Sequence, residues 1–211
     1  PGSGIQDTDM DSCFRRNDKP HKRFLFGIIQ GAKHQDLREE SAKYISSLDF
    51  DGIAIGGESI GYNMEATKEI LDWVAPYLPE NKPRYTMGVG LDPADLLQVV
   101  EQGIDMFDCV APTRLARHGM LFVGPKVNAK HRINIKNSAF AKDAGPIDKN
   151  CECPTCKNYS RAYLHHLFAA EEISAMRLST IHNLHLMLNL MRQAREAIQK
   201  DNFRELKQQW Q

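Results

Sequence analysis

The sequence has no apolar run that approaches the roughly 20 residues of a membrane-spanning helix, and no signal-peptide core precedes its first recognisable pattern. Net charge is also lacking, because 27 basic side chains balance 27 acidic ones. The 211 residues and 42% apolar content exclude a disordered chain and fit one compact domain, or one domain with a small appendage. We therefore expect a globular protein that does not cross a membrane.

Acidic residues are missing from one long segment. Residues 110–142 contain seven Lys or Arg and no Asp or Glu. This local surplus favours an anionic partner, of which a phosphate backbone is the commonest, over the alternative of a solvated charged face. The only aromatic residues there are Phe122 and Phe140, so repeated base stacking is not expected. Short apolar pieces alternate with Gly, Pro and Asn over 111–145 and predict a β-hairpin or a long loop.

Cysteine is scarce, with five residues in all, but three of them lie within six positions. The motif Cys151-x-Cys153-x-x-Cys156 predicts one structural zinc ion in a reducing compartment, the cytoplasm, better than it predicts a secreted disulfide framework. A closed tetrahedral site needs a fourth ligand. The candidates are two pairs of histidines: His165 with His166, and His182 with His185.

Four short apolar segments alternate with segments of helical periodicity in the first half of the chain. A strand apolar on both faces is typical of a parallel sheet covered by helices, so the pattern predicts an α/β fold. Four such strands fit a small open sheet or half of an eight-stranded barrel of about 250 residues. The expected strands are 24–30, 51–57, 84–90 and 103–110, and the expected helices are 34–48, 63–78 and 93–102, the last capped by Asp92.

Polar and glycine residues gather where these strands end, at Gln30, Gly56-Gly57, Met87 and Asp108. Ligands bind at this edge in either parallel architecture. A carboxylate there can act as nucleophile or general base, and Asp108 lies nearer the strand end than Asp105. The alternatives are that Asp108 caps a loop or pairs with Arg114, and that the glycines make tight turns.

The C-terminal third of the chain is predicted to be helical. Two helices are expected at about 159–176 and 181–200, separated by a break at Ser179-Thr180. The tail to Trp210 extends the second helix in this prediction.

These features together resemble the tRNA-guanine transglycosylases of bacterial type, over about residues 20–205. The resemblance covers a barrel, a zinc cluster and a basic loop in one order. The strings that carry it are Phe26-Gly-Ile-Ile-Gln-Gly31, Ala54-Ile-Gly-Gly57, Arg84-Tyr-Thr-Met-Gly-Val-Gly90, Asp105-Met-Phe-Asp-Cys-Val110, Pro112-Thr-Arg114, the cysteine motif, Ser160-Arg-Ala-Tyr-Leu-His-His166 and Thr180-Ile-His182-Asn183.

The resemblance implies a (β/α)8 barrel enzyme of queuosine biosynthesis that replaces the tRNA wobble guanine with a 7-deazaguanine base. Asp108 is then the nucleophile that forms a covalent ribosyl intermediate. By the same resemblance Gln30 and the Gly57 amide bind the base edge, and Met87 packs on the base face. Arg114 and Arg117 match the residues that bind the anticodon loop. The implied zinc ligands are Cys151, Cys153, Cys156 and His182.

The segment after the double glycine bears on which base is inserted. Ile60 matches the position at which a bulky aliphatic side chain blocks queuine, so the resemblance implies the smaller preQ1. Glu58 stands where the bacterial pattern usually has Leu, and its carboxylate could pair with the ammonium group of preQ1.

The family's N-terminal half, with its general acid/base Asp, has no counterpart in the sequence. We therefore expect the C-terminal half of a barrel, inactive without the N-terminal half and part of a homodimer in the full-length enzyme. A noncatalytic, zinc-stabilised accessory subunit that binds tRNA is the alternative, and a carbohydrate glycosidase is a third reading. The expected division is an expression scar with a disordered tail (1–20), a half barrel with the catalytic edge (21–115), a basic excursion (116–145) and a zinc-binding helical subdomain (146–211).

Overall fold

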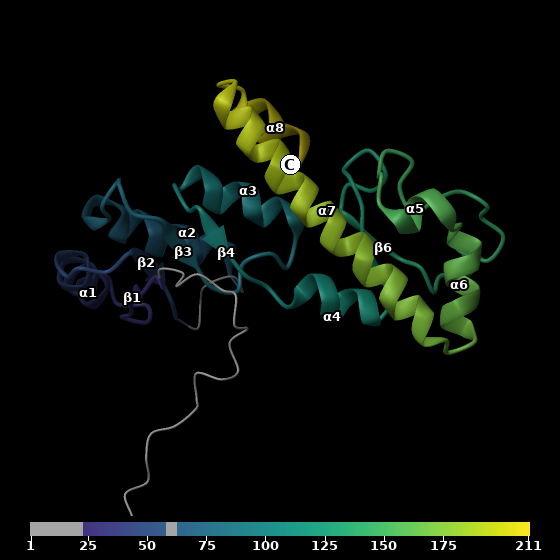
Figure 1. The fold of residues 1–211 in the computed structure, drawn as a ribbon, viewed down its shortest axis with the longest axis horizontal. Coiled ribbons are helices and arrows are strands. Elements are labelled where there is room, and N and C mark those ends of the chain that lie inside the picture. Colours follow the sequence, from purple (N-terminus) through teal and green to yellow (C-terminus); the bar gives the residue numbers. More distant parts are fainter. Residues whose placement is uncertain (1–22, 58–62) are drawn as a thin grey trace, which may run out of the picture.

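The computed structural model describes residues 23–57 and 63–211. Four parallel strands lie in the order β1-β2-β3-β4 and alternate along the chain with helices (Figure 1). The alternation and the parallel sheet predicted from the sequence are confirmed. These elements are β1 (Phe26–Ile29), α1 (Gln35–Ser47), β2 (Gly52–Ile55), α2 (Met64–Val74), the 3-10 turn Ala75–Tyr77, β3 (Arg84–Thr86), α3 (Pro93–Glu101) and β4 (Met106–Phe107).

The second half of the chain forms a largely helical unit beside the sheet. A two-stranded antiparallel hairpin, β5 and β6, lies within it. Its elements are α4 (Ala111–Arg117), β5 (Met120–Phe122), β6 (Arg132–Asn134), the 3-10 turn Ser138–Phe140, α5 (Pro154–Asn158), α6 (Arg161–Ala169), α7 (Ile173–Gln199) and α8 (Phe203–Gln209). Helix α7 is long, but neither it nor any other helix in the described residues is apolar enough to cross a membrane.

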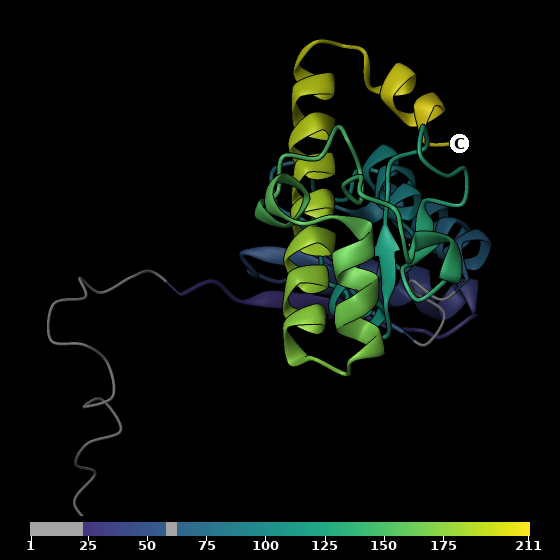
Figure 2. The same ribbon diagram turned by 90° about the vertical axis from the view of Figure 1, so that its right-hand side faces the viewer.

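Helix α7 joins the two halves, as it runs past α4, α5 and α6 and reaches α3 and α8 (Figures 1 and 2). Its buried Leu186, Met187 and Leu190 pack into the same core as Ile55 of β2 and Leu96 of α3. A second, smaller core lies under the hairpin and the cysteine loop. The sheet and the cysteine-bearing unit therefore share one long helix.

Helices cover one face of the sheet and leave the other largely open. On the covered face, Ile29 and Ile55 are fully buried. On the opposite face, register aligns Ile28, Ala54, Tyr85 and Met106 in one row. Ile28 is 42% exposed and Met106 48% exposed, so this apolar row is only partly covered by the described residues.

Four predictions about the helices were wrong, three of them before residue 200 and one in the tail. Residues 111–117 form helix α4, whereas a hairpin or loop was predicted there. A helix of seven residues is too short to show helical periodicity in the sequence. Pro112 was the one available signal, because proline suits the first turn of a helix. The predicted break at Ser179-Thr180 lies inside the continuous α7, because Ser179 belongs to the buried stripe that packs this helix. The helix expected at 159–176 ends at Ala169.

Two residues with left-handed backbone explain where the last helices end. Glu171 has φ +56° and separates α6 from α7, and Asp201 has φ +55° and separates α7 from α8. This conformation cannot continue a right-handed helix. The tail to Trp210 is therefore a separate helix and not an extension of α7, since the chain reverses at Asp201.

A buried arginine holds the ends of β1 and β2 together. Arg38 of α1 is fully buried, and its guanidinium donates to Ala32 O at 2.9 Å and to Gly56 O at 2.5 Å, with a longer bond to Ile29 O at 3.4 Å. Gly57 adopts φ +131°, and a Cβ added there would lie 2.3 Å from Arg38 Nη2. Glycine is thus required at 57 both by its backbone and by the guanidinium.

We predict that Arg38→Met lowers the free energy of unfolding by about 3 kcal/mol, because buried carbonyl groups lose a charged donor. The matched control is Lys43→Met on the same helix, whose ammonium lies exposed, 3.6 Å from Glu39. Its effect should stay within about 0.5 kcal/mol. Urea denaturation measures both values, and equal midpoints for the two variants would contradict this role of Arg38.

Candidate functional site

The strand register brings the predicted edge residues into one row. Ile29 pairs with Ile55, Ile55 with Thr86, and Thr86 with Phe107. The residues that follow these four positions are Gln30, Gly56, Met87 and Asp108. Adjacent strands lie about 4.8 Å apart, so these four residues form one continuous row along this edge of the sheet.

Gln30 and the double glycine are in direct proximity. A Cβ added to Gly56 would lie 2.8 Å from Gln30 Nε2, so the carboxamide of Gln30 lies over this glycine. Both Gln30 and Gly57 are exposed. Gln30 and Gly57, which follow neighbouring strands, are therefore both accessible at this edge. Glu58 and Ile60, predicted to continue this wall, lie outside the described residues.

Asp108 is held by two donors at the end of β4. Its Oδ1 accepts a hydrogen bond from the Tyr85 hydroxyl at 2.6 Å and from the Gly88 N–H at 3.3 Å. Within the described residues Asp108 forms no ion pair with Arg114. Asp105 lies at the other end of the strand, where its Oδ2 accepts from the Arg84 N–H at 2.9 Å. Asp108 is thus the carboxylate at the ligand edge, and Asp105 serves the strand pairing.

Tyr85 was not singled out in the sequence, although it lies two residues before Met87. The hydrogen bond to Asp108 raises the pKa of Tyr85 to about 12, with smaller contributions from burial and from the charge of Asp108. The phenol therefore stays protonated and remains a donor to the carboxylate at neutral pH. The sequence did contain a signal: side chains alternate along a strand, so Tyr85 lies on the same face as Met87, two positions further on.

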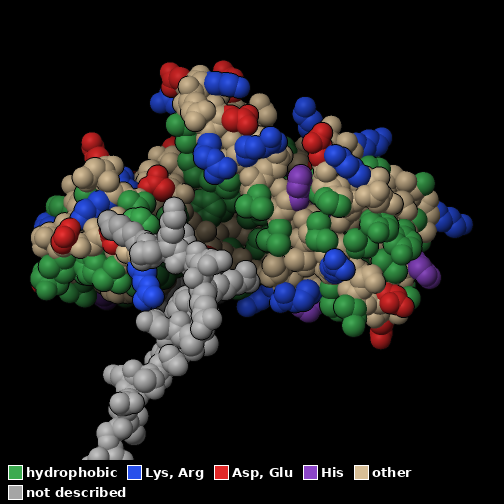
Figure 3. Space-filling view, in the orientation of Figure 1, with side chains coloured by type: hydrophobic (Ala, Val, Ile, Leu, Met, Phe, Trp, Pro, Cys, Tyr) green, Lys and Arg blue, Asp and Glu red, His purple; other side chains and the backbone are tan. Residues whose placement is uncertain are grey.

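Helix α4 places two arginines close to this edge. It begins at Ala111, three residues after Asp108, and both Arg114 and Arg117 are exposed. Figure 3 shows Lys and Arg side chains where α4 lies in Figure 1. Cations in the last turn also interact favourably with the helix dipole. The geometry offers an anion two positive charges next to the carboxylate edge.

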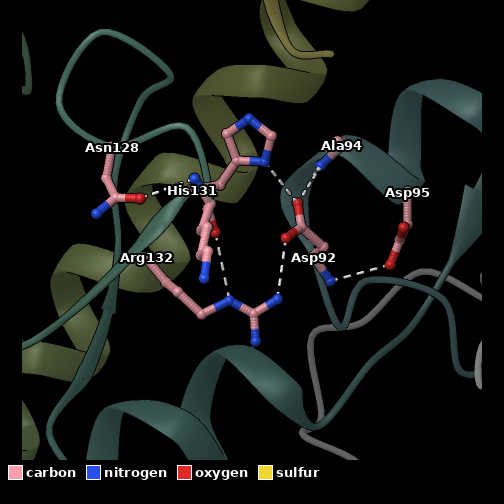
Figure 4. Close-up of polar contacts among 7 residues, drawn as sticks. Asp92, Ala94, Asp95, Asn128, His131 and Arg132 are labelled. Atoms are coloured by element: carbon pink, nitrogen blue, oxygen red, sulfur yellow. Dashed lines mark hydrogen bonds and ion pairs between the residues drawn. The ribbon is translucent and has the colours of Figure 1, made fainter.

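A polar junction ties the hairpin to the helix that follows β3 (Figure 4). Asp92, the N-cap of α3, accepts from Ala94 N–H at 3.0 Å and contacts His131 Nδ1 at 2.9 Å and Arg132 Nη2 at 3.0 Å. The Asp92 N–H in turn donates to Asp95 at 3.0 Å. The capping role predicted for Asp92 is confirmed, and its carboxylate also fixes the basic hairpin against the sheet.

Three cysteines and one histidine converge in the helical unit. The ligand atoms of Cys151, Cys153, Cys156 and His182 lie within 4.8 Å of one another. His182 Nδ1 is 3.7, 3.5 and 3.4 Å from the three sulfur atoms in chain order. Hydrogen bonds from the Cys151 and Cys156 thiols hold the pKa of the Cys153 thiol well below its ordinary value. The cluster could hold a metal ion.

The other three candidate histidines do not join the cysteines in the described structure. His165 and His166 lie on α6, and His185 lies almost one turn beyond His182 on α7. His182 is fully buried, and its Nε2 lies 2.7 Å from Phe122 O. A carbonyl can only accept, so Nε2 carries a proton, and Nδ1 is the ring nitrogen that faces the three sulfur atoms.

The chain is similar to known proteins of one family. A family model described as queuine tRNA-ribosyltransferase matches residues 8–211. Proteins named queuine tRNA-ribosyltransferase from Bacillus cereus (strain B4264) and Bacillus thuringiensis (strain Al Hakam) are each 45% identical to the chain over 200 residues. The match covers 95% of the chain and 51% of each relative, so the chain spans about half the length of the curated relatives it matches.

We predict that Tyr85 stays protonated at pH 11, where an ordinary tyrosine with a pKa of about 10 is mostly ionised. Asp108→Asn removes the charged acceptor and should return the pKa of Tyr85 toward the ordinary value. The ¹³Cζ chemical shift of Tyr85, assigned by its loss in Tyr85→Phe, reports the ionisation. A Tyr85 resonance that titrates near pH 10 in the unmodified chain would contradict the bond.

Proposed function

The chain belongs to the queuine tRNA-ribosyltransferase family, and from that premise we propose that it supplies the nucleophile of a tRNA base-exchange enzyme. The observation that carries the proposal is Asp108, bound by Tyr85 at 2.6 Å at the sheet edge that also presents Gln30 and Gly57. The reaction replaces the wobble guanine of tRNA with a 7-deazaguanine, as in queuosine biosynthesis.

Asp108 acts in two displacement steps in this proposal. One carboxylate oxygen attacks the ribose anomeric carbon, the glycosidic bond breaks, and its electron pair leaves with guanine. Guanine takes up a proton as it leaves, and the resulting ester holds the tRNA. N9 of the incoming base then attacks the same carbon, gives up its proton and releases the carboxylate with the bonding pair. The general acid/base proposed for the N-terminal half supplies the first proton and accepts the second. Two inversions give retention. The Tyr85 hydroxyl and the Gly88 N–H orient the carboxylate on Oδ1, which leaves Oδ2 available to react.

The neighbouring residues of the row recognise the base. Gln30 and the Gly57 amide hydrogen-bond its polar edge, and Met87 packs on its face. Support comes from the placement of the Gln30 carboxamide over Gly56. We further propose preQ1 as the inserted base, because the branched Ile60 restricts the room that queuine needs and Glu58 offers a carboxylate to the ammonium of preQ1.

Helix α4 and the basic hairpin bind the anticodon loop of the tRNA. Arg114 and Arg117 are exposed within ten residues of Asp108, so RNA bound by them can place a nucleotide at the carboxylate. Arginine suits this role because its planar fork binds phosphate or guanine edges in bidentate geometry. A noncatalytic accessory subunit would need this helix but not Asp108, so the presence of Asp108 favours the catalytic role.

The cysteine cluster holds one structural zinc ion in this proposal. A tetrahedral zinc site with bonds of about 2.3 Å to sulfur and about 2.0 Å to nitrogen gives sulfur–nitrogen separations of about 3.5 Å. The observed separations of 3.4 to 3.7 Å fit this geometry without rearrangement. Four protein ligands leave no open position, so the ion stabilises the helical unit and takes no part in base exchange.

The open face of the sheet supports completion by further strands. Ile28 and Met106 are both more than 40% exposed, and β1 and β4 are edge strands of the described sheet. Unpaired edges and an uncovered apolar face are what closure of a barrel removes. We propose that the N-terminal half of the barrel supplies the missing strands and the general acid/base, and that the complete enzyme is a homodimer.

Zinc binding is tested by metal analysis of the chain purified without chelators. We predict one zinc ion per chain and its loss in Cys153→Ala, with the helical unit unfolding before the sheet. Cys109→Ala is the control, because Cys109 lies outside the cluster and should leave the zinc content unchanged. A zinc content well below one per chain, or a different metal at full occupancy, would contradict the assignment.

The nucleophile is tested by incorporation of labelled guanine into tRNA by the assembled enzyme that contains this chain. Asp108→Asn should abolish exchange, since a carboxamide does not attack the anomeric carbon, while tRNA binding persists. Asp105→Asn is the matched control, because its side chain can still accept from the Arg84 N–H and lies at the opposite strand end. Robust turnover by Asp108→Asn would place the nucleophile elsewhere.

A further inference from the structure

Asn183 occupies the point where α7 meets both α4 and β5. Its side chain is fully buried. The carboxamide oxygen accepts from the Phe122 N–H at 2.9 Å, while Nδ2 donates to Pro112 O at 2.9 Å and to Met120 O at 3.1 Å. Both Nδ2 protons and the oxygen are used, so the surroundings determine one orientation of this amide.

The residue before it is the candidate metal ligand His182. Phe122 O lies 2.7 Å from His182 Nε2, and the Phe122 N–H donates to Asn183. His182 and Asn183, two successive residues of α7, therefore bind the carbonyl and the N–H of Phe122. A neighbouring strand would bind the same two backbone groups in a sheet. The cluster residue His182 and Asn183, which binds α4, are adjacent on one helix. The cysteine cluster and the first turn of α4 can therefore move little relative to each other.

We propose that Asn183 is a positioning residue that carries the placement of the metal cluster to helix α4, and so fixes Arg114 and Arg117 relative to Asp108. This inference rests on the RNA-binding role proposed for α4. Pro112, whose carbonyl Asn183 binds, lies in the chain between Asp108 and Arg114. Asn183 is the side chain of α7 that binds a backbone group in the first turn of α4, so loss of this bond frees that turn and allows both arginines to shift.

The physical reason for an amide at this position is the geometry of its acceptors. The carbonyl groups of Pro112 and Met120 come from different elements, α4 and β5, and Nδ2 reaches both. An apolar side chain of similar size fills the space but leaves two carbonyls and one N–H without these partners. Unpaired buried groups favour a local rearrangement that restores contact with water, here a displacement of α4.

The test uses the full chain and an anticodon stem-loop RNA with guanine at the wobble position. Asn183→Leu should weaken RNA binding by about tenfold while zinc content stays unchanged, because the four ligands are retained. The control is Asn189→Leu on the same helix, where the carboxamide accepts an exposed hydrogen bond from Arg192 at 2.6 Å and forms no hydrogen bond to α4 or β5 in the described part of the chain. This control should bind RNA like the unmodified chain.

A double-mutant cycle separates positioning from general destabilisation. If Asn183 acts through the arginines, adding Asn183→Leu to Arg114→Ala with Arg117→Ala should cause no further loss of binding. Additive losses, or loss of zinc from Asn183→Leu, would overturn the proposal. Should Asn183→Leu fail to fold, Asn183→Ser removes the donors to Pro112 and Met120 with a smaller side chain and takes its place in the cycle.

Hydrogen exchange distinguishes failure of this inference from failure of the proposed function. In Asn183→Leu with zinc retained, the amides of residues 111–117 should exchange faster while those of α1 do not change. A result in which this exchange becomes faster while the Arg114→Ala and Arg117→Ala variants bind RNA normally would refute the RNA-binding role of α4. The same result would support the positioning of α4 by Asn183. Unchanged exchange over 111–117 would refute the link itself.

Discussion

The backbone of Phe122 is bound by two successive side chains of α7, and the arrangement of the second half of the chain depends on this contact. His182 binds the Phe122 carbonyl and Asn183 binds its N–H. The same histidine turns its other nitrogen to three cysteines, and the same asparagine reaches the first turn of α4. One short segment of helix thus joins the candidate metal cluster, the hairpin and the arginine-bearing helix.

This contact explains how a unit with a small core can hold helix α4 next to the sheet edge that carries Asp108. The hairpin is short, and a two-stranded sheet is marginal by itself. The cysteine cluster fixes the loop that precedes α5, and Asp92 binds His131 and Arg132 from the other side of the hairpin. The basic hairpin is therefore fixed on one side by the cysteine cluster and on the other by Asp92, beside the strand ends that include Asp108.

Much of the fold and of the candidate site could be predicted from the sequence, because the signals are local. Strand–helix alternation follows from apolar runs closed by glycine or Asp, and the cysteine spacing is itself a ligand pattern. The strands are shorter than the apolar runs predicted, and the largest differences are at β3, which ends at Thr86, and β4, which spans only Met106–Phe107. Spacing alone left His165, His166, His182 and His185 as alternatives, and the resemblance pointed to His182. The structure brings His182 to the cysteines because that position of α7 faces β5, where Nε2 lies 2.7 Å from Phe122 O.

The residues that sequence reasoning missed are those whose role depends on distant partners. Tyr85 meets a carboxylate 23 positions away, and Asn183 binds a carbonyl 71 positions away. Arg38 looks like a surface residue of an amphipathic helix but is fully buried against backbone carbonyls. No periodicity marks such residues. Helix α4 was missed for a different reason, because its seven residues depend on packing against α7 rather than on intrinsic helix propensity.

The most direct measurement of the central claim is the chemical identity of the residue that holds the RNA. The assembled enzyme is incubated with tRNA in the absence of an incoming base, denatured, and digested with nuclease and protease for peptide mass mapping. The account predicts a ribosyl remnant on the peptide that contains Asp108, joined through its carboxylate. A remnant on any other residue, or tRNA that is released intact on denaturation, would contradict it.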